Sequence, residues 1–318
     1  PATINMRVLK RLTDYDWATT EIAKFNLETN LSPQVFTDKA LSNLERENLE
    51  QVALVREAAK KSGARIILTG ILPTLRKFDL ARENLTPKPR YHALIDAISA
   101  HSASNTFELR LQGIDEIFLK HASPLLEACN TSYQVHLQVT PQSFVPLYNI
   151  AQALAGPVTA ISANSPLVFG KRLWHETRIA LFQQALDVRT SSHHLRERLP
   201  RVNFGSGWLD NSILDIYRED ISRFREEESL EKIKQGQAPK LKALQVHNGT
   251  VYRWNRPCYG ISGNGKPHLR IENRVIPAGP TILDQTANAA FWLGAMIGFG
   301  TQYKDVREHM GWADVQDN

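Results

Sequence analysis

Cysteine is scarce in this sequence of 318 residues, which contains only Cys129 and Cys258. Two cysteines are too few for a disulfide framework, and no Cys-x-x-Cys or Cys/His spacing indicates a zinc site. The first residues (PATINMR) contain no apolar core of a signal peptide. A reducing cytoplasm is therefore the expected compartment.

Long apolar runs and a strong charge of one sign are also missing. No stretch of eighteen or more residues lacks polar interruption, so we expect no membrane span. The net charge is +5, but basic residues alternate with acidic ones, as in RFREEE at 223–228, and no basic tract is interleaved with aromatics. A mild positive excess suits a polyanion such as a nucleoside triphosphate. A nucleic-acid-binding protein is an alternative that rests on charge alone.

The overall composition is that of an ordinary globular protein, with 42% hydrophobic and 22% charged residues. The length fits one α+β domain with a large sheet as well as two domains. No internal repeat or low-complexity segment occurs. The regular elements must therefore be found from local patterns.

Residues 133–139 (YQVHLQV) alternate between polar and apolar side chains. A period of two predicts a half-buried strand, with His136 and Gln138 on its polar face. The alternative is a strand of an antiparallel sheet whose polar face meets only solvent.

An apolar helix is predicted over 144–161, and Ser162–Pro166 (SANSP) is typical of an ordered loop. A second helix, over 174–186, carries Arg178. Together with the preceding strand, we expect these elements to form the base and one side of a binding pocket.

The remaining chain predicts further strands and helices. Asn248-Gly249 between apolar runs predicts a β-hairpin with a type I′ turn. Gly260–Lys266 lacks the flanks of a P-loop and is interpreted as a flexible connection. The other predicted strands cover 24–30, 64–69, 106–112 and 268–276, and the other predicted helices cover 37–61, 91–100, 114–128, 208–234 and 281–299.

Two of these strands carry charged residues in unusual positions. Glu28 shares a predicted strand face with amides, and Arg270, Glu272 and Arg274 share one face of the strand over 268–276. The plain interpretation is solvent-facing carboxylates and an exposed ion-pair ladder. The functional interpretation is a metal-binding carboxylate beside guanidinium groups that bind phosphate oxygens.

Seven short motifs follow one another in an order that resembles the glutamate–cysteine ligase family, including its bacterial carboxylate–amine ligase and plant-type branches. The resemblance covers roughly residues 20–300, and ANSP is its most specific part. The motifs are FNLE (25–28), TGILP (69–73), PKPRY (87–91), SYQVH (132–136), ANSP (163–166), TR (177–178) and LRIENR (269–274).

The resemblance implies a glutamine-synthetase-like α+β fold, in which a curved antiparallel sheet with flanking helices forms the active site. It also implies an ATP- and Mg²⁺-dependent carboxylate–amine ligase, with Mn²⁺ as a possible substitute. ATP would phosphorylate an amino-acid carboxylate, and an amine would attack the acyl phosphate. The expected partners are therefore small molecules and a nucleotide, without nucleic acid or membrane, and the oligomeric state is left open.

The resemblance also assigns metal-binding roles. Glu28 and Glu272 match metal-binding carboxylates, and His136 matches a histidine close to the metal or the nucleotide. Divalent ions would neutralise the phosphate oxygens during transfer.

Further residues match positions that bind nucleotide or substrate. Arg270 and Arg274 resemble ligands for phosphate or the substrate carboxylate, and Arg178 resembles a substrate-binding arginine. The resemblance also implies that Asn164 shapes the substrate pocket. The expected catalytic residues are thus Arg178, Arg270 and Arg274, and His136, Arg270 and Asn164 are expected to bind the cofactor.

One departure from the family pattern concerns the start of the chain. Family members begin with a strand carrying a Glu-x-Glu pair of metal ligands, whereas no glutamate precedes Glu21 and the sequence starts at Pro1. We therefore expect residues 1–318 to be a single ligase-like domain from a longer chain that lacks this strand. The alternative is a non-catalytic, regulatory homologue that binds a nucleotide or an amino acid.

Overall fold

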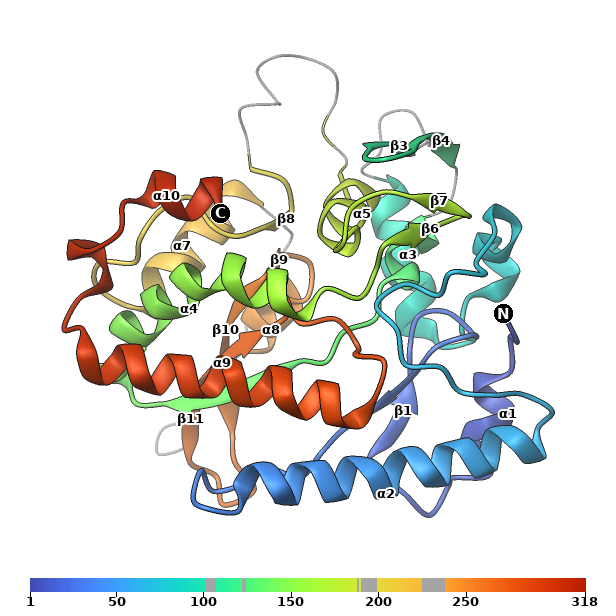
Figure 1. The fold of residues 1–318 in the computed structure, drawn as a ribbon, viewed down its shortest axis with the longest axis horizontal. Helices are drawn as coiled ribbons and strands as arrows, with labels where there is room; N and C mark the ends of the chain where they lie inside the picture. The colour runs from blue at the N-terminus through green and yellow to red at the C-terminus, as the bar shows by residue number, and fades with distance from the viewer. Residues whose placement is uncertain (101–106, 122–123, 188, 190–198, 225–237) are drawn as a thin grey trace. The chain divides into compact units, whose positions relative to one another are not determined.

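The computed structural model describes residues 1–100, 107–121, 124–187, 189, 199–224 and 238–318, and it confirms the α+β class (Figure 1). The described strands form five small sheets, of which all but the β8–β9 pair are antiparallel. Two compact units divide the chain. The first unit comprises 1–133, 162–188 and 277–290, and the second comprises 134–161, 189–276 and 291–318.

The first unit contains short strand pairs and helices around two apolar clusters. The larger cluster contains Leu80, Leu109, Leu126 and Leu181, which are almost fully buried. The elements of this unit, besides the beginning of α9, are α1 (Asn5–Leu9), β1 (Ala18–Thr20), β2 (Leu27–Thr29), α2 (Ala40–Lys61), η1 (Lys77–Leu80), η2 (Arg82–Asn84), α3 (Pro89–Ala100), β3 (Phe107–Gln112), β4 (Glu116–His121), η3 (Pro124–Cys129), β6 (Leu167–Val168), β7 (Lys171–Arg172) and α5 (Arg178–Ala185).

The second unit contains the three-stranded sheet, in the order β10–β11–β5. Val135, Val139 and Ile271 are buried on one side of this sheet, and each such side chain contributes about 1.5–3 kcal/mol. The elements of this unit are β5 (Val135–Val139), α4 (Pro141–Ser162, without its last residue), β8 (Val202–Asn203), α7 (Ile213–Arg223), α8 (Lys242–Asn248), β9 (Tyr252–Arg253), β10 (Asn255–Ile261), β11 (Pro267–Asn273), α9 (Ile282–Gln302, from Phe291), η4 (Val306–Glu308) and α10 (Trp312–Asp317).

Helix α4 is long and apolar enough to cross a membrane by length and composition alone. The helix nevertheless carries buried amides with protein partners. Asn149 donates to the Leu209 carbonyl at 2.8 Å, and Gln152 accepts from the Asn255 amide at 2.7 Å. These contacts suit the core helix of a folded unit, because buried amides need such partners.

Several sequence predictions are confirmed, among them the strands at 106–112, 133–139 and 268–276 and the helices at 37–61, 144–161 and 281–299, with small shifts of their ends. The helix predicted over 174–186 begins at Arg178, as α5. Of the helix predicted over 208–234, α7 covers 213–223, and residues 225–234 lie outside the described part.

Two predicted elements in the first unit are wrong. Residues 64–69 form no strand in the described structure. Their apolar positions alternate in burial, but Ile67 is 65% exposed and no neighbouring strand pairs with them. The helix predicted over 114–128 is instead strand β4 followed by η3, because Ile117 and Leu119 alternate with polar or exposed positions and pair with β3.

Two predicted connections in the second unit are also wrong. Asn248 ends α8, and β9 after it pairs in parallel with β8, so Asn248-Gly249 terminates a helix and does not form a hairpin. Gly260–Lys266 is an ordered hairpin between β10 and β11. Ser262 N–H donates to the Lys266 carbonyl at 2.9 Å, and Gly265 takes a φ of +79°, which glycine adopts without strain.

Candidate functional site

One face of the β10–β11–β5 sheet gathers polar side chains into cross-strand rows. Glu272 on β11 lies opposite His136 on β5 and opposite Arg256 on β10. In the next row, Arg270 lies opposite Cys258 and Gln138. Directly opposed residues in an antiparallel pair project to the same side, so the strand register builds this polar face.

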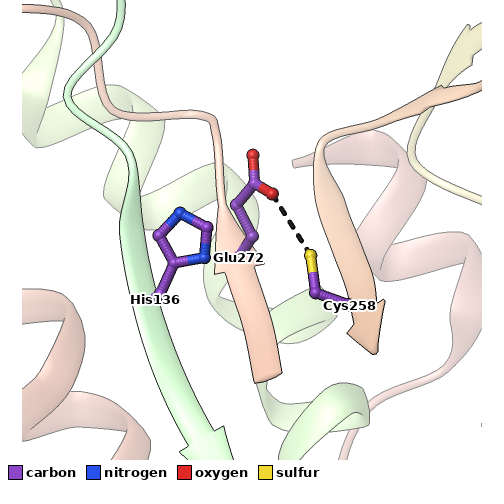
Figure 2. A group of neighbouring side chains, drawn as sticks. All are labelled: His136, Cys258 and Glu272. Carbon is purple, nitrogen blue, oxygen red and sulfur yellow. Dashed lines mark hydrogen bonds between the residues drawn. The ribbon is translucent and has the colours of Figure 1, made fainter. Parts of the chain in front are cut away.

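Three potential metal ligands meet on this face, one from each strand (Figure 2). Glu272 lies between His136 and Cys258, and the ligand atoms of the three residues all lie within 4.8 Å of one another. The Cys258 thiol donates to Glu272 Oε2 at 3.3 Å. Burial and the adjacent Glu272 carboxylate raise the pKa of Cys258 to about 12, so the thiol is neutral at ordinary pH.

Arginines surround the Glu272 carboxylate without forming close hydrogen bonds to it. Arg256 lies 3.6 Å and Arg274 lies 3.5 Å from its oxygens. Burial alone would raise the pKa of Glu272, but Arg274 and Arg256 outweigh burial and hold this pKa below its ordinary value. The carboxylate is therefore ionised and keeps lone pairs free for a ligand.

Residue His136 keeps part of its surface open to solvent, and no hydrogen bond to its ring occurs within the described residues. Desolvation of the ring lowers its pKa, and although Glu272 acts in the opposite direction, Arg270, Arg274 and Arg256 lower it further. The neutral imidazole that results offers a lone pair to a metal.

A hydrogen-bonded chain orients Arg270. Its NH1 group donates to His268 Nε2 at 2.8 Å, so His268 carries its proton on Nδ1 and donates it to Ser262 Oγ at 2.9 Å. Gly260 leaves room for this ring, because a Cβ atom there would lie 2.7 Å from His268 Nε2. Within the described residues, Arg270 Nε is buried and has no hydrogen-bond partner.

The first unit contains a second acidic group. Thr19 on β1 pairs with Glu28 on β2, and Glu21 follows two residues after Thr19, which places it diagonally beside Glu28. Glu21 hydrogen-bonds Glu28. Burial, this hydrogen bond and the Glu28 charge raise the pKa of Glu21 to about 8. Glu21 was not predicted as a site residue, and the available signal was the hairpin pairing of its flanking strands.

Arg178 lies inside the first unit and is 1% exposed. Its Nε donates to Glu176 Oε1 at 3.1 Å, and its NH1 donates to Ser132 Oγ at 2.8 Å. Asn164 donates its side-chain amide to the Ala278 carbonyl at 2.8 Å and its backbone N–H to Glu176 Oε2 at 3.0 Å. Both residues thus hold the ANSP loop through Glu176.

The structure divides the seven predicted site residues between the units. It brings His136, Arg270, Glu272 and Arg274 together on one sheet face in the second unit. The other three, Glu28, Asn164 and Arg178, belong to the first unit, where the glutamate lies on the β1–β2 hairpin and the other two lie at the ANSP loop. Their predicted roles stay predictions.

The two groups of potential ligands suit different metals. Mg²⁺ prefers oxygen ligands in an octahedral arrangement, and the carboxylates of Glu21 and Glu28 offer oxygens only. A proton shared between two carboxylates is also what a divalent cation would replace. The imidazole, thiol and carboxylate of the second unit form a mixed set that fits Mg²⁺ poorly.

An α+β fold with carboxylate, imidazole and guanidinium groups on a sheet face has the side chains that enzymes use to bind phosphates and carboxylates. A family model described as Glutamate-cysteine ligase family 2 (GCS2) matches residues 4–298. The chain belongs to this ligase family, as the sequence motifs predicted. No curated protein matches the chain.

Proposed function

We propose that this protein is an ATP- and Mg²⁺-dependent carboxylate–amine ligase. Family membership supports a ligase. The observation that carries the nucleotide part is the sheet face on which Arg256 and Arg274 flank the ionised Glu272 carboxylate and Arg270 lies in the next cross-strand row. Positive charge in excess of negative charge suits the phosphates of a nucleotide.

In the proposed reaction, a carboxylate oxygen of an amino acid attacks the γ-phosphorus of ATP, and ADP leaves. An amine nitrogen then attacks the acyl carbon of the mixed anhydride, and inorganic phosphate leaves as the amide forms. The protein forms no covalent bond with the substrates. Its contribution is positioning and the stabilisation of charge.

Three groups of residues would supply distinct parts of this chemistry. Arg270 Nε is a buried donor that has no partner among the residues described by the structure, and a phosphate oxygen would satisfy it. Glu21 and Glu28, in the first unit, offer a pair of carboxylates that would suit Mg²⁺. Arg178 and Asn164 would act through the ANSP loop, whose shape they fix.

Hydroxylamine tests the proposal directly, since it converts an acyl phosphate into a hydroxamate. The purified chain should form ADP and a hydroxamate only with ATP, Mg²⁺ and a carboxylate substrate, which a panel of amino acids would identify. Glu272→Gln should lower the rate at least about tenfold, and Glu308→Gln, at an exposed position on η4, should not. ADP formation that is independent of any carboxylate would refute the ligase.

A second candidate is a non-catalytic homologue that binds a nucleotide or an amino acid. One observation favours it: Arg178, expected to bind substrate, is buried and bonded to Glu176 and Ser132. Nucleotide binding by calorimetry without ADP formation across the amino-acid panel would support this candidate over the ligase.

A further inference from the structure

The Cys258 thiol completes a set of three unlike ligand atoms that sequence motifs did not reveal. His136 and Glu272 were expected near a metal, whereas Cys258 joins them only through the register of β10 against β11. All three residues lie on neighbouring strands of one sheet, so their backbones are held in place by ladder hydrogen bonds. Side chains held on strands in this way are positioned more precisely for binding a ligand than side chains on loops are.

The spacing of the ligand atoms is close to that of a metal site. Ligand atoms bound tetrahedrally to a zinc-sized ion lie about 3.5 Å apart, given metal–ligand distances of about 2.0–2.3 Å. The distance between Cys258 Sγ and Glu272 Oε2 is 3.3 Å. The remaining separations do not exceed 4.8 Å.

The Glu272 carboxylate forms no close hydrogen bond with its two arginine neighbours, Arg256 and Arg274. Its separations from Arg256 and Arg274, 3.6 and 3.5 Å, exceed hydrogen-bond lengths. By contrast, the buried pair of Arg253 and Asp220 in the same unit has a 2.6 Å contact. Among the described residues, only the Cys258 thiol donates a hydrogen bond to Glu272.

Charge sets a condition on metal binding here. Among the residues that the structure describes on this sheet face, Arg256, Arg270 and Arg274 outnumber the carboxylate of Glu272, so a dication alone would meet a positive field. An anion bound to the same arginines removes this penalty. A polyphosphate is the fitting anion, because it can contact several guanidinium groups and also supply oxygen ligands to the metal.

We propose that His136, Cys258 and Glu272 bind a thiophilic divalent cation of the zinc or cobalt type, together with a polyphosphate. On binding, the S–H bond of Cys258 breaks, a sulfur–metal bond forms and the proton passes to the buffer, without any change of oxidation state. The polyphosphate part rests on the proposed function, whereas the choice of metal rests on the thiol.

Cobalt(II) tests this site, since a cobalt–thiolate bond produces a charge-transfer absorption in the near ultraviolet. The full chain is titrated with Co²⁺ in the presence and absence of tripolyphosphate. We expect the band to appear with the wild type and to be lost in Cys258→Ser. Tripolyphosphate should tighten Co²⁺ binding at least about tenfold, and an excess of Mg²⁺ should not displace the cobalt.

The sequence offers a matched control, because Cys129 is the only other cysteine. Cys129→Ala should keep the band. Alkylation provides a readout without substitution: Co²⁺ with tripolyphosphate should protect Cys258 of the wild type from iodoacetamide, as measured by mass spectrometry. The proposal would be overturned if the wild type gave no band or if the band persisted in Cys258→Ser. Displacement of the bound cobalt by an excess of Mg²⁺ would also overturn it.

The outcome is separable from that of the ligase assay. A cobalt band without hydroxamate formation would keep the metal site and count against the ligase. Hydroxamate formation with Mg²⁺ at equal rates in the wild type and Cys258→Ser, without a cobalt band, would keep the ligase and overturn the thiophilic site.

Discussion

Glu21 hydrogen-bonds Glu28 beside the β1–β2 hairpin, and burial together with this neighbour raises the pKa of Glu21 to about 8. The pair has two consequences. It places two carboxyl groups beside one another in the first unit, and it makes the stability of this unit depend on pH.

The sign of this dependence follows from the direction of the shift. A carboxyl group whose pKa is higher in the folded than in the unfolded state stabilises the fold below its unfolded pKa, and the contribution is lost as the pH rises through the folded pKa. For Glu21 the range is 4.5 to about 8. Stability to urea should therefore fall over this range in the wild type, and Glu21→Gln should flatten the fall.

At pH 9 we expect Glu21→Gln to exceed the wild type by about 1 kcal/mol, a value discounted for partial exposure of the side chain. Glu50→Gln, at an exposed position on α2, is the control. Mg²⁺ should stabilise the wild type at pH 9 more than Glu21→Gln, since the ion takes the place of the shared proton. Identical pH profiles for the wild type and Glu21→Gln would contradict the shifted pKa.

Arg178→Ala should destabilise the protein by about 3–5 kcal/mol, because it leaves the Glu176 carboxylate buried without its guanidinium partner. Urea denaturation measures the loss. Arg172→Ala, which removes a 66% exposed partner of Asp115, should cost less than about 1 kcal/mol. Equal losses in the two variants would show that Arg178 has no special structural role.

Gly260→Ala tests the packing behind Arg270. The added Cβ would lie 2.7 Å from His268 Nε2, so the ring must turn and its bond to Arg270 must lengthen. The displaced rotamer should cost about 0.5–1.5 kcal/mol. Nitrogen chemical shifts of His268 should report loss of the single Nδ1–H tautomer, whereas Gly263→Ala, where a Cβ meets nothing within 4 Å, should leave them unchanged.

The polar face of the site was largely predictable from strand periodicity. Alternation placed His136 on one polar strand face and Arg270, Glu272 and Arg274 on another, and the sheet joins these faces. The register that sets Glu272 opposite His136 could not be predicted, because it depends on pairing across more than a hundred residues. Cys258 was missed for a local reason: Gly260–Lys266 was interpreted as a flexible connection, so the β10–β11 hairpin that brings Cys258 beside Glu272 was not predicted.

The errors in the fold have related physical causes. Residues 64–69 satisfy the burial pattern of a strand, but a strand needs a partner, and no local feature reports its absence. Asn248-Gly249 suits both a hairpin turn and the end of a helix, and the parallel pairing of β9 with β8 decided between them. Arg178 matched a family motif, while its contacts with Glu176 and Ser132 required the folded loop.

Glu272→Gln should make the thermal stability of the protein more dependent on added anions. In the wild type, the Glu272 carboxylate balances part of the charge of Arg256 and Arg274, and these arginines in turn hold its pKa below the ordinary value. Removal of this charge leaves the arginines to repel one another. Thermal unfolding without added anions should therefore occur at a lower temperature in Glu272→Gln than in the wild type.

Tripolyphosphate should reverse this loss, because its oxygens can take the place of the missing carboxylate. The rise in melting temperature on adding tripolyphosphate should be larger for Glu272→Gln than for the wild type, and high salt should reduce it. Glu308→Gln, at an exposed position on η4 in the same unit, should respond as the wild type does. An equal response of all three proteins would mean that the arginines around Glu272 do not bind the anion. The positive face would then be a structural ion-pair network, and the nucleotide would have to bind elsewhere on the chain.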